Sequence, residues 1–174
     1  MERKHLTRAL RKAGCPVEVI EHCKAVERLA NRIADEIAEN GHEVDRALVS
    51  MGALVHDIGR SETHGIEHGV TGAKILREMG LGSLSSFAER HIGAGIPAEE
   101  AEALGLKRKD YIPTTIEEKI VAYADKLVDG KRVVSYEKVL ERFREELGPD
   151  HPAIERLKRL HGEIEELRSG KRSP

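Results

Sequence analysis

Apolar residues recur at intervals of three and four positions along almost the whole chain, and this spacing constrains the fold more than any other feature. It places apolar side chains on one face of an α-helix, whereas a half-buried β-strand needs an apolar residue at every second position. No convincing alternating run of that kind occurs in the sequence. The pattern therefore predicts an all-α protein, built as a bundle of about seven to nine helices.

Three helices are predicted in the first third of the chain, and the first is a short one over 6–13 that ends at Gly14. An apolar stripe indicates one long helix over 17–39. Asp45 is a suitable N-cap for the next helix, expected over 45–56, which contains ALVSMGALV and is apolar on nearly every side. A helix of that composition belongs at the centre of the bundle. Gly59 follows it and is expected to turn the chain away.

The middle of the chain is less regular. Shorter helices are expected over 68–79 and 84–92. The segment over 93–113 is looser, with one short helix, and could act as a lid over a pocket. Thr115 and Glu118 have the spacing of a capping box, which marks the start of another helix.

A chain of 174 residues can bury one hydrophobic core, so we expect a single domain. This domain should span 1–168, with a motif-bearing part over 15–131 and two charged amphipathic helices over 135–168. Residues 169–174 are expected to form a flexible tail.

Composition bears on compartment and partners. The chain has 29 basic and 31 acidic residues, and this balance favours neither nucleic acid nor an anionic membrane as a partner. Its amino terminus lacks the apolar core of a signal peptide, and no apolar run approaches the roughly 20 residues that span a bilayer. We therefore expect a cytoplasmic protein in which Cys15 and Cys23 are reduced core residues. The scarcity of side-chain amides and the abundance of charge resemble the composition of thermophile proteins.

Histidine and aspartate gather at or near apolar helical positions. A carboxylate beside apolar surface costs several kcal/mol to desolvate unless it is paired or metal-bound. Imidazole nitrogen and carboxylate oxygen together suit divalent transition ions. Any one of the histidines taken alone is better explained by a structural hydrogen bond, whereas the aspartates are harder to explain in that way. The candidates are His22, His56, Asp57, His68, His91 and Asp125.

The order of these residues resembles that of the HD-domain metal-dependent phosphohydrolases, in particular the branch named for its HDIG motif. The matching segments are EHCKAVERLA, ALVHDIGR, EHGVTGAKIL, ERHIGAGI and KIVAYADKLVDG. Two positions depart from the family pattern. Members often have lysine where this chain has Arg60, and some two-metal members have a second histidine where it has Ile92.

The resemblance implies a single-domain HD helical bundle and a metal site. His22, His56, Asp57 and Asp125 match the positions that hold one ion. His68 and His91 match the added histidines of the two-metal subset, in which Asp57 bridges the ions. We therefore expect one or two divalent transition-metal ions as cofactor, chosen from manganese, iron, cobalt, nickel and zinc.

These residues predict a hydrolase. Ions about 3.5 to 4 Å apart can generate a hydroxide near neutral pH and neutralise phosphate oxygens during in-line attack. We expect hydrolysis of a phosphomonoester or phosphodiester of a small nucleotide-like substrate by this metal-activated hydroxide. The candidate catalytic residues are Asp57, Arg60, His64 and Lys126, and the candidate phosphate contacts are Arg60, His64, Lys126 and Lys131. For the three cations a surface ion pair is an equally good explanation, and His64 could instead cap a loop.

Two alternatives stay open. One is a nucleotide-binding regulatory module with little turnover, although a pure binder has less need of six coordinating positions. The other is RNA binding, which is disfavoured because the sequence shows no aromatic stacking platform and no basic run. The charged helices over 135–168 could also pack on a second copy in a homodimer.

Overall fold

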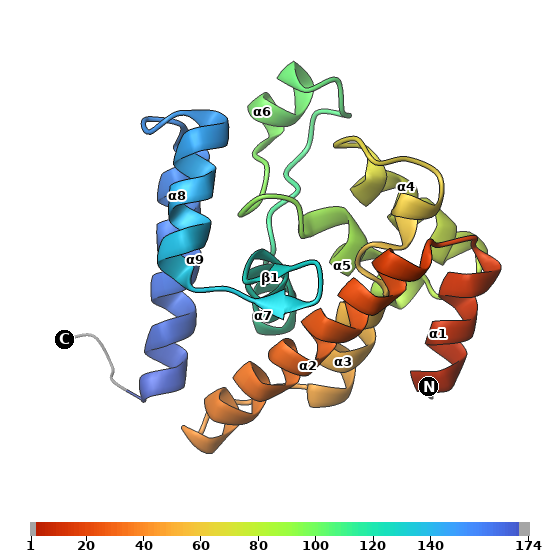
Figure 1. The fold of residues 1–174 in the computed structure, drawn as a ribbon, viewed down its shortest axis with the longest axis horizontal. Coiled ribbons are helices and arrows are strands. Elements are labelled where there is room, and N and C mark those ends of the chain that lie inside the picture. Colours follow the sequence, from red (N-terminus) through yellow and green to blue (C-terminus); the bar gives the residue numbers. More distant parts are fainter. Residues whose placement is uncertain (1–2, 171–174) are drawn as a thin grey trace.

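The computed structural model describes residues 3–170 and contains, within that range, nine α-helices and one small β-hairpin (Figure 1). The helices are α1 (Arg3–Lys12), α2 (Val17–Glu39), α3 (Arg46–Val55), α4 (His68–Glu78), α5 (Ser85–Arg90), α6 (Ala98–Ala103), α7 (Ile116–Lys126), α8 (Tyr136–Leu147) and α9 (Pro152–Ser169). Short 3₁₀ turns, Ile58–Ser61 and Gly82–Leu84, precede α4 and α5. The all-α prediction is confirmed.

The centre of the bundle is α3, as its apolar composition predicts. Val49, Ala53, Leu54 and Val55 have no exposed surface, and α3 packs against α2 and α7. The helix begins where the sequence indicates, because the side chain of Asp45 accepts a hydrogen bond from the backbone N–H of Leu48. The packing of α2, α3 and α7 on one another brings together residues that are far apart in the sequence.

A close backbone contact fixes α4 against the 3₁₀ turn that follows α3. A Cβ atom added to Gly59 would lie 1.9 Å from the carbonyl oxygen of His68 and 2.6 Å from the amide nitrogen of Gly72. Gly59 lies in a 3₁₀ turn after α3, so its turning of the chain stays a prediction, and the close contact gives it a further role. Gly59 is required because only a residue without a side chain lets α4 approach so closely.

The hairpin was not foreseen. Strands β1 (Val128–Asp129) and β2 (Arg132–Val133) pair antiparallel directly after α7, and Gly130 has a φ of 59° in the turn. Strands of two residues are too short to show alternation in a sequence. The available signal was the Asp-Gly dipeptide, which favours tight hairpin turns when apolar residues flank it.

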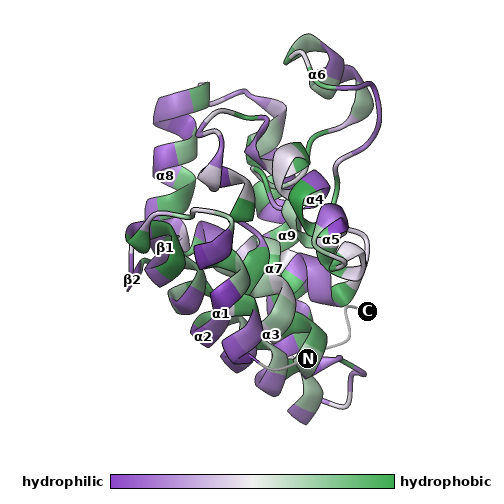
Figure 2. Ribbon diagram, turned by 90° about the vertical axis from the view of Figure 1, so that its right-hand side faces the viewer, coloured by the Kyte–Doolittle hydropathy of each residue, from purple (hydrophilic) through white to green (hydrophobic). Residues whose placement is uncertain are grey.

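One short helix, α6, projects from one end of the bundle in both Figure 1 and Figure 2. A small apolar cluster of Ile96, Ala101 and Tyr111 anchors it, and Ile96 and Tyr111 exchange backbone hydrogen bonds. The expectation of a looser segment with one short helix is confirmed. Its expected action as a lid stays a prediction.

The carboxyl-terminal helices are long and amphipathic, with apolar residues of α8 and α9 in the core. Helix α9 continues to Ser169 and ends at Gly170 with a φ of 63°, so the helix is longer than expected. The predicted tail otherwise falls on residues 171–174, outside the described residues. Within 3–170 no helix combines the length and the apolar character needed to cross a bilayer.

Candidate metal centre

Five helices deliver the six predicted ligands to one place. His22 comes from α2, His56 and Asp57 follow the last residue of α3, and His68 is the first residue of α4. His91 follows the last residue of α5, and Asp125 lies near the carboxyl end of α7. All six side chains are buried or nearly buried. The sequence candidates thus form one cluster.

The first group surrounds one oxygen of Asp125. Its Oδ1 lies 2.9 Å from Nε2 of His22 and 3.3 Å from Nε2 of His56. Oδ2 of Asp57 lies 3.9 Å from each of these two nitrogens. Ligand atoms of His22, His56 and Asp125 lie within 4.8 Å of one another, a spacing that could hold one metal ion.

The second group surrounds the other oxygen of Asp57. Its Oδ1 lies 3.2 Å from Nε2 of His68 and 3.3 Å from Nε2 of His91. These two imidazole nitrogens are 3.0 Å apart. Asp57 therefore presents one carboxylate oxygen to each group, which is the arrangement that a bridging ligand requires.

Backbone carbonyl groups orient all four histidines. A carbonyl oxygen only accepts hydrogen bonds, so the Nδ1 atom facing it carries the ring hydrogen, and in a neutral ring Nε2 presents a lone pair to the cluster. Such carbonyl partners are a common means of orienting metal-binding imidazoles. The Nδ1-to-carbonyl distances are 3.0 Å for His22 to Gly130, 2.8 Å for His56 to Ala53, 2.7 Å for His68 to Gly65 and 2.8 Å for His91 to Ala88.

The cluster has more acceptors than donors. Nε2 of His56 and Oδ1 of Asp57 are buried and have no hydrogen-bond partner. A buried polar atom without a partner costs about 1–3 kcal/mol. A cation between the lone pairs would remove that cost, and mixed nitrogen and oxygen ligands suit divalent transition ions. The residues present therefore fit a metal ion.

The charge states of Asp57, Asp125 and His91 agree with ligand chemistry. Burial opposes a charge on His56, but Cys23 and Asp57 raise its pKa well above the usual value, so a metal ion at this nitrogen must displace a proton. Burial alone would raise the pKa of the Asp57 carboxyl, but the imidazoles around it hold that pKa well below its usual range. Burial likewise opposes a charge on Asp125, whose pKa is held low by Lys126 and His22. Burial lowers the pKa of His91 to about 4, so this imidazole is neutral at pH 7. Two carboxylates and a neutral imidazole are ready to coordinate a cation.

An ion pair beside the cluster joins α5 to α7. Nη1 of Arg90 lies 2.9 Å from Oε2 of Glu118, and the same oxygen accepts from the backbone N–H of Thr114 at 2.8 Å. Glu118 also completes the predicted capping box with Thr115, which is confirmed. Because Arg90 precedes His91, this contact fixes the position of one ligand relative to the helix that carries Asp125.

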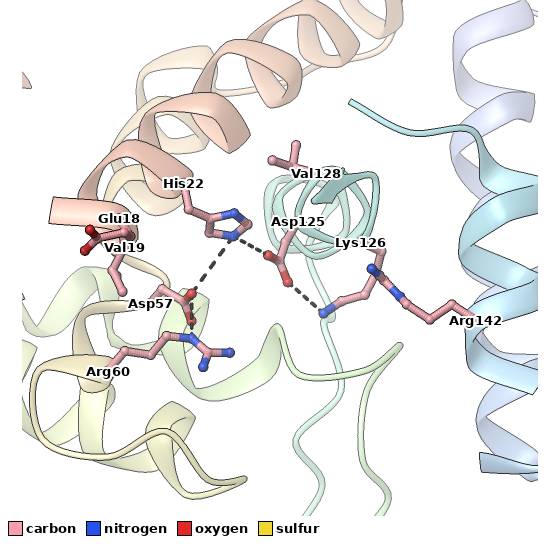
Figure 3. A pocket seen from close by; sticks show the side chains of 9 residues that line it. All are labelled: Glu18, Val19, His22, Asp57, Arg60, Asp125, Lys126, Val128 and Arg142. Atoms are coloured by element: carbon pink, nitrogen blue, oxygen red, sulfur yellow. Dashed lines mark hydrogen bonds and ion pairs between the residues drawn. The ribbon is translucent and has the colours of Figure 1, made fainter. Parts of the chain in front are cut away.

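A cavity of about 340 Å³ opens over His22, Asp57 and Asp125 (Figure 3). Three cations line it. Arg60 donates through Nε to Oδ2 of Asp57 at 2.8 Å, and Nζ of Lys126 lies 2.6 Å from Oδ2 of Asp125. The third, Arg142, reaches the cavity from α8 and was not foreseen. No local motif marks Arg142, because its position depends on how α8 packs.

Two predicted phosphate contacts lie apart from this cavity. His64 is exposed and precedes α4, which begins only at His68. The four-residue separation of His64 and His68 is not one helical turn, because the residues between them are not helical. Lys131 is exposed in the hairpin turn, next to Gly130, and does not line the cavity either. The geometry brings Arg60 and Lys126 to the site, but not these two.

Comparisons with known proteins agree with the geometry. The family model described as HD domain matches residues 19–129. An uncharacterized protein of Methanocaldococcus jannaschii is 54% identical over 88% of this chain and 91% of its own length. A tRNA (cytidine(56)-2'-O)-methyltransferase of Picrophilus torridus is 43% identical over 86% of this chain, which spans only 42% of that enzyme. Ribonuclease Y of Acidothermus cellulolyticus is 27% identical over 80% of this chain and 26% of its own length. No solved structure matched.

Proposed function

Because this chain belongs to the HD domain family, we propose that it is a metal-dependent phosphohydrolase whose substrate is a phosphomonoester or phosphodiester of a small nucleotide-like molecule. The observation that carries the proposal is the pair of buried acceptors, Nε2 of His56 and Oδ1 of Asp57, beneath a cavity lined by three cations. The buried acceptor atoms can coordinate metal ions, and the three basic side chains can bind an anionic group. Both are expected of an enzyme that hydrolyses phosphate esters.

We assign two metal positions that share Asp57. His22, His56 and Asp125 surround the first, and His68 and His91 surround the second. Divalent ions held there would lower the pKa of water and neutralise phosphate oxygens. The neutral imidazole of His91 and the ionised carboxylate of Asp57 at pH 7 are the protonation states that this role needs.

The chain's own cations bind and orient the phosphate. Arg60 uses Nε on Asp57, which leaves its two terminal nitrogens for phosphate oxygens. Lys126 and Arg142 reach the same cavity from α7 and α8 (Figure 3). Hydrolysis forms one P–O bond from water and breaks the ester P–O bond, and a proton from water ends on the released alcohol. Cations that contact the phosphate throughout stabilise the negative charge that shifts onto the leaving oxygen.

The test is a substrate panel with the protein loaded separately with manganese, iron, cobalt, nickel or zinc. We expect release of phosphate, or of a nucleotide from a diester, with at least one metal, and loss of both activity and bound metal in Asp57→Asn. The exposed histidine His42, outside the cluster, provides the matched control His42→Ala, which should retain both. Undiminished hydrolysis by Asp57→Asn would refute the mechanism. Tight nucleotide binding without product, across all metals, would favour the regulatory module instead.

RNA is a second candidate substrate, favoured by a group of cations on the surface. A cavity of about 330 Å³ along α1 and α2 is lined by Arg3, Lys4, Arg8, Arg11 and Lys24 together with Thr7. The relatives named as a tRNA methyltransferase and a ribonuclease give this candidate further support. We expect tRNA binding, if it occurs, to weaken with salt, and Arg8→Ala with Arg11→Ala to reduce the salt dependence. Failure to bind tRNA at any salt concentration would eliminate this candidate, and binding that neither salt nor these variants change would exclude this group of cations as the site.

A further inference from the structure

A second cavity adjoins the metal cavity. Its volume is about 430 Å³, and Lys126 and Arg142 line both cavities. Beyond these two cations its lining is mostly apolar, and the other ionisable residues are Glu100, Glu146, His151 and Arg156. The large apolar lining residues are Ile66, Ile92, Ile96, Leu104, Phe143 and Leu147. A molecule held at the cations by its phosphate can therefore extend over metal ligands on one side and over apolar surface on the other.

Two of the apolar residues are unusually exposed. Leu104, at the end of α6, is 45% exposed, and Leu147, at the end of α8, is 44% exposed. They account for two of the four large hydrophobic residues that are exposed among residues 3–170; the others are Val17 and Val133. Figure 1 shows α6 and α8 at the same end of the molecule. Apolar surface that faces a cavity is stabilised when an apolar group displaces its water.

Helix α9 contributes a charged residue to the lining of the second cavity. Arg156 of α9 binds Glu100 of α6 through Nη2, at 2.7 Å to one carboxylate oxygen and 2.9 Å to the other. Both residues line the second cavity, and Nε of Arg156 is buried without a hydrogen-bond partner. The cavity thus combines apolar residues with the ion pair of Glu100 and Arg156. Ligand pockets commonly combine these features, with volumes of about 300–1,000 Å³.

We propose that this second cavity holds the leaving group of the substrate, and that the leaving group carries a planar aromatic ring of nucleoside size. The proposal rests on the phosphohydrolase function proposed above. Lys126 and Arg142 hold the phosphate at the junction of the two cavities, and Leu104 and Leu147 contact the ring. These two leucines then determine specificity, because a leaving group without an apolar part gains nothing from their walls.

The experiment compares two phosphate esters, adenosine 5'-monophosphate and ribose 5-phosphate. Both contain ribose, and only the first carries the aromatic base. The experiment uses the metal-loaded full chain, the variants Leu104→Ser and Leu147→Ser, and the control Val133→Ser. Val133 is 53% exposed but lines none of the cavities described above. All three substituted residues are exposed, so folding should tolerate each change, and thermal unfolding checks this. Calorimetric titration with each ester supplies a readout independent of turnover.

We expect the wild type to prefer the nucleotide by about tenfold or more in kcat/KM and in affinity, which is the scale of one lost apolar contact. Leu104→Ser and Leu147→Ser should each remove most of that preference by weakening the nucleotide alone, and Val133→Ser should retain it. Equal use of both esters by the wild type, or a preference that survives both leucine variants, would overturn the proposal while leaving the phosphohydrolase function intact.

The two proposals can fail separately. If no ester is hydrolysed but the nucleotide binds and both leucine variants weaken that binding, the cavity assignment stands and the hydrolase function fails. If the leucine variants instead convert a dimer to a monomer in size-exclusion chromatography and leave nucleotide affinity unchanged, a second copy covers the cavity. That result would overturn the assignment.

Discussion

The substitution Gly59→Ala should separate the packing of the site from its chemistry. The added Cβ would lie 1.9 Å from the carbonyl oxygen of His68 and 2.6 Å from the amide nitrogen of Gly72. Both neighbours are backbone atoms, so no side chain can rotate away and α4 must shift. Overpacking of this kind costs about 1–3 kcal/mol. For a domain of this size each kcal/mol corresponds to about 2–4 °C in Tm, so the Tm should fall by roughly 2–12 °C.

The shift should also weaken the second metal position more than the first. His68 is the first residue of α4, so displacing its carbonyl displaces its imidazole relative to Asp57. Thermal unfolding followed by circular dichroism, with metal titration by calorimetry, measures both effects. The matched control is Gly162→Ala in α9, where nothing lies within 4 Å of the added Cβ, and helix propensity should stabilise it by about 0.5–1 kcal/mol. A Gly59→Ala protein with the Tm and metal affinity of the wild type would refute this reasoning.

Three further predictions concern charge and metal. Arg142→Ala should lower kcat/KM at least tenfold, mainly through a higher KM, and Arg142→Lys should recover part of the loss. Steady-state kinetics measure both variants. An alanine variant with the kcat/KM of the wild type would show that Arg142 does not contact the substrate. Burial opposes ionisation of Glu118, but the Thr114 amide and Arg90 hold the pKa of its carboxyl below the ordinary value. The ionised carboxylate therefore stabilises the fold above its unfolded pKa of about 4.3, and this stabilisation is lost as pH falls through the lower folded pKa. Glu118→Gln should therefore lower the Tm at pH 7, and the gap to the wild type should narrow below about pH 4; a gap independent of pH contradicts this. Removing metal with a chelator should lower the Tm, and added metal should restore it in a concentration-dependent way. The reason is that an ion that binds only the folded state stabilises it by mass action. An unchanged Tm after chelation would count against bound metal.

The ligand cluster could be predicted from the sequence for a physical reason. Each ligand lies at or near an apolar helical face, where an unpaired carboxylate or imidazole is costly, so its identity is informative without a structure. The central position of α3 followed from its all-round apolar composition, and the start of α7 followed from the Thr115 and Glu118 capping box. These features depend on local sequence, which periodicity and capping chemistry can reveal.

The cavity walls could not be predicted in the same way. Arg142 reaches the site only because α8 packs against α9, which in turn packs against α7, and nothing in its own helix distinguishes it from neighbouring cations. Leu104 and Leu147 face one cavity from helices far apart in sequence. His64 lies apart from the metal cavity because the segment between it and His68 is not helical. Long-range packing, rather than local pattern, decides which surface residues meet a substrate.

The central claim is that Asp57 joins two metal positions, and the metal content of purified variants tests it most directly. Elemental analysis after saturation with manganese and removal of excess ion should give two ions per chain in the wild type and one in His68→Ala. Asp57→Ala should lose both, because its two oxygens face different positions. Retention of two ions in Asp57→Ala, or the same content in His68→Ala as in the wild type, would contradict the account.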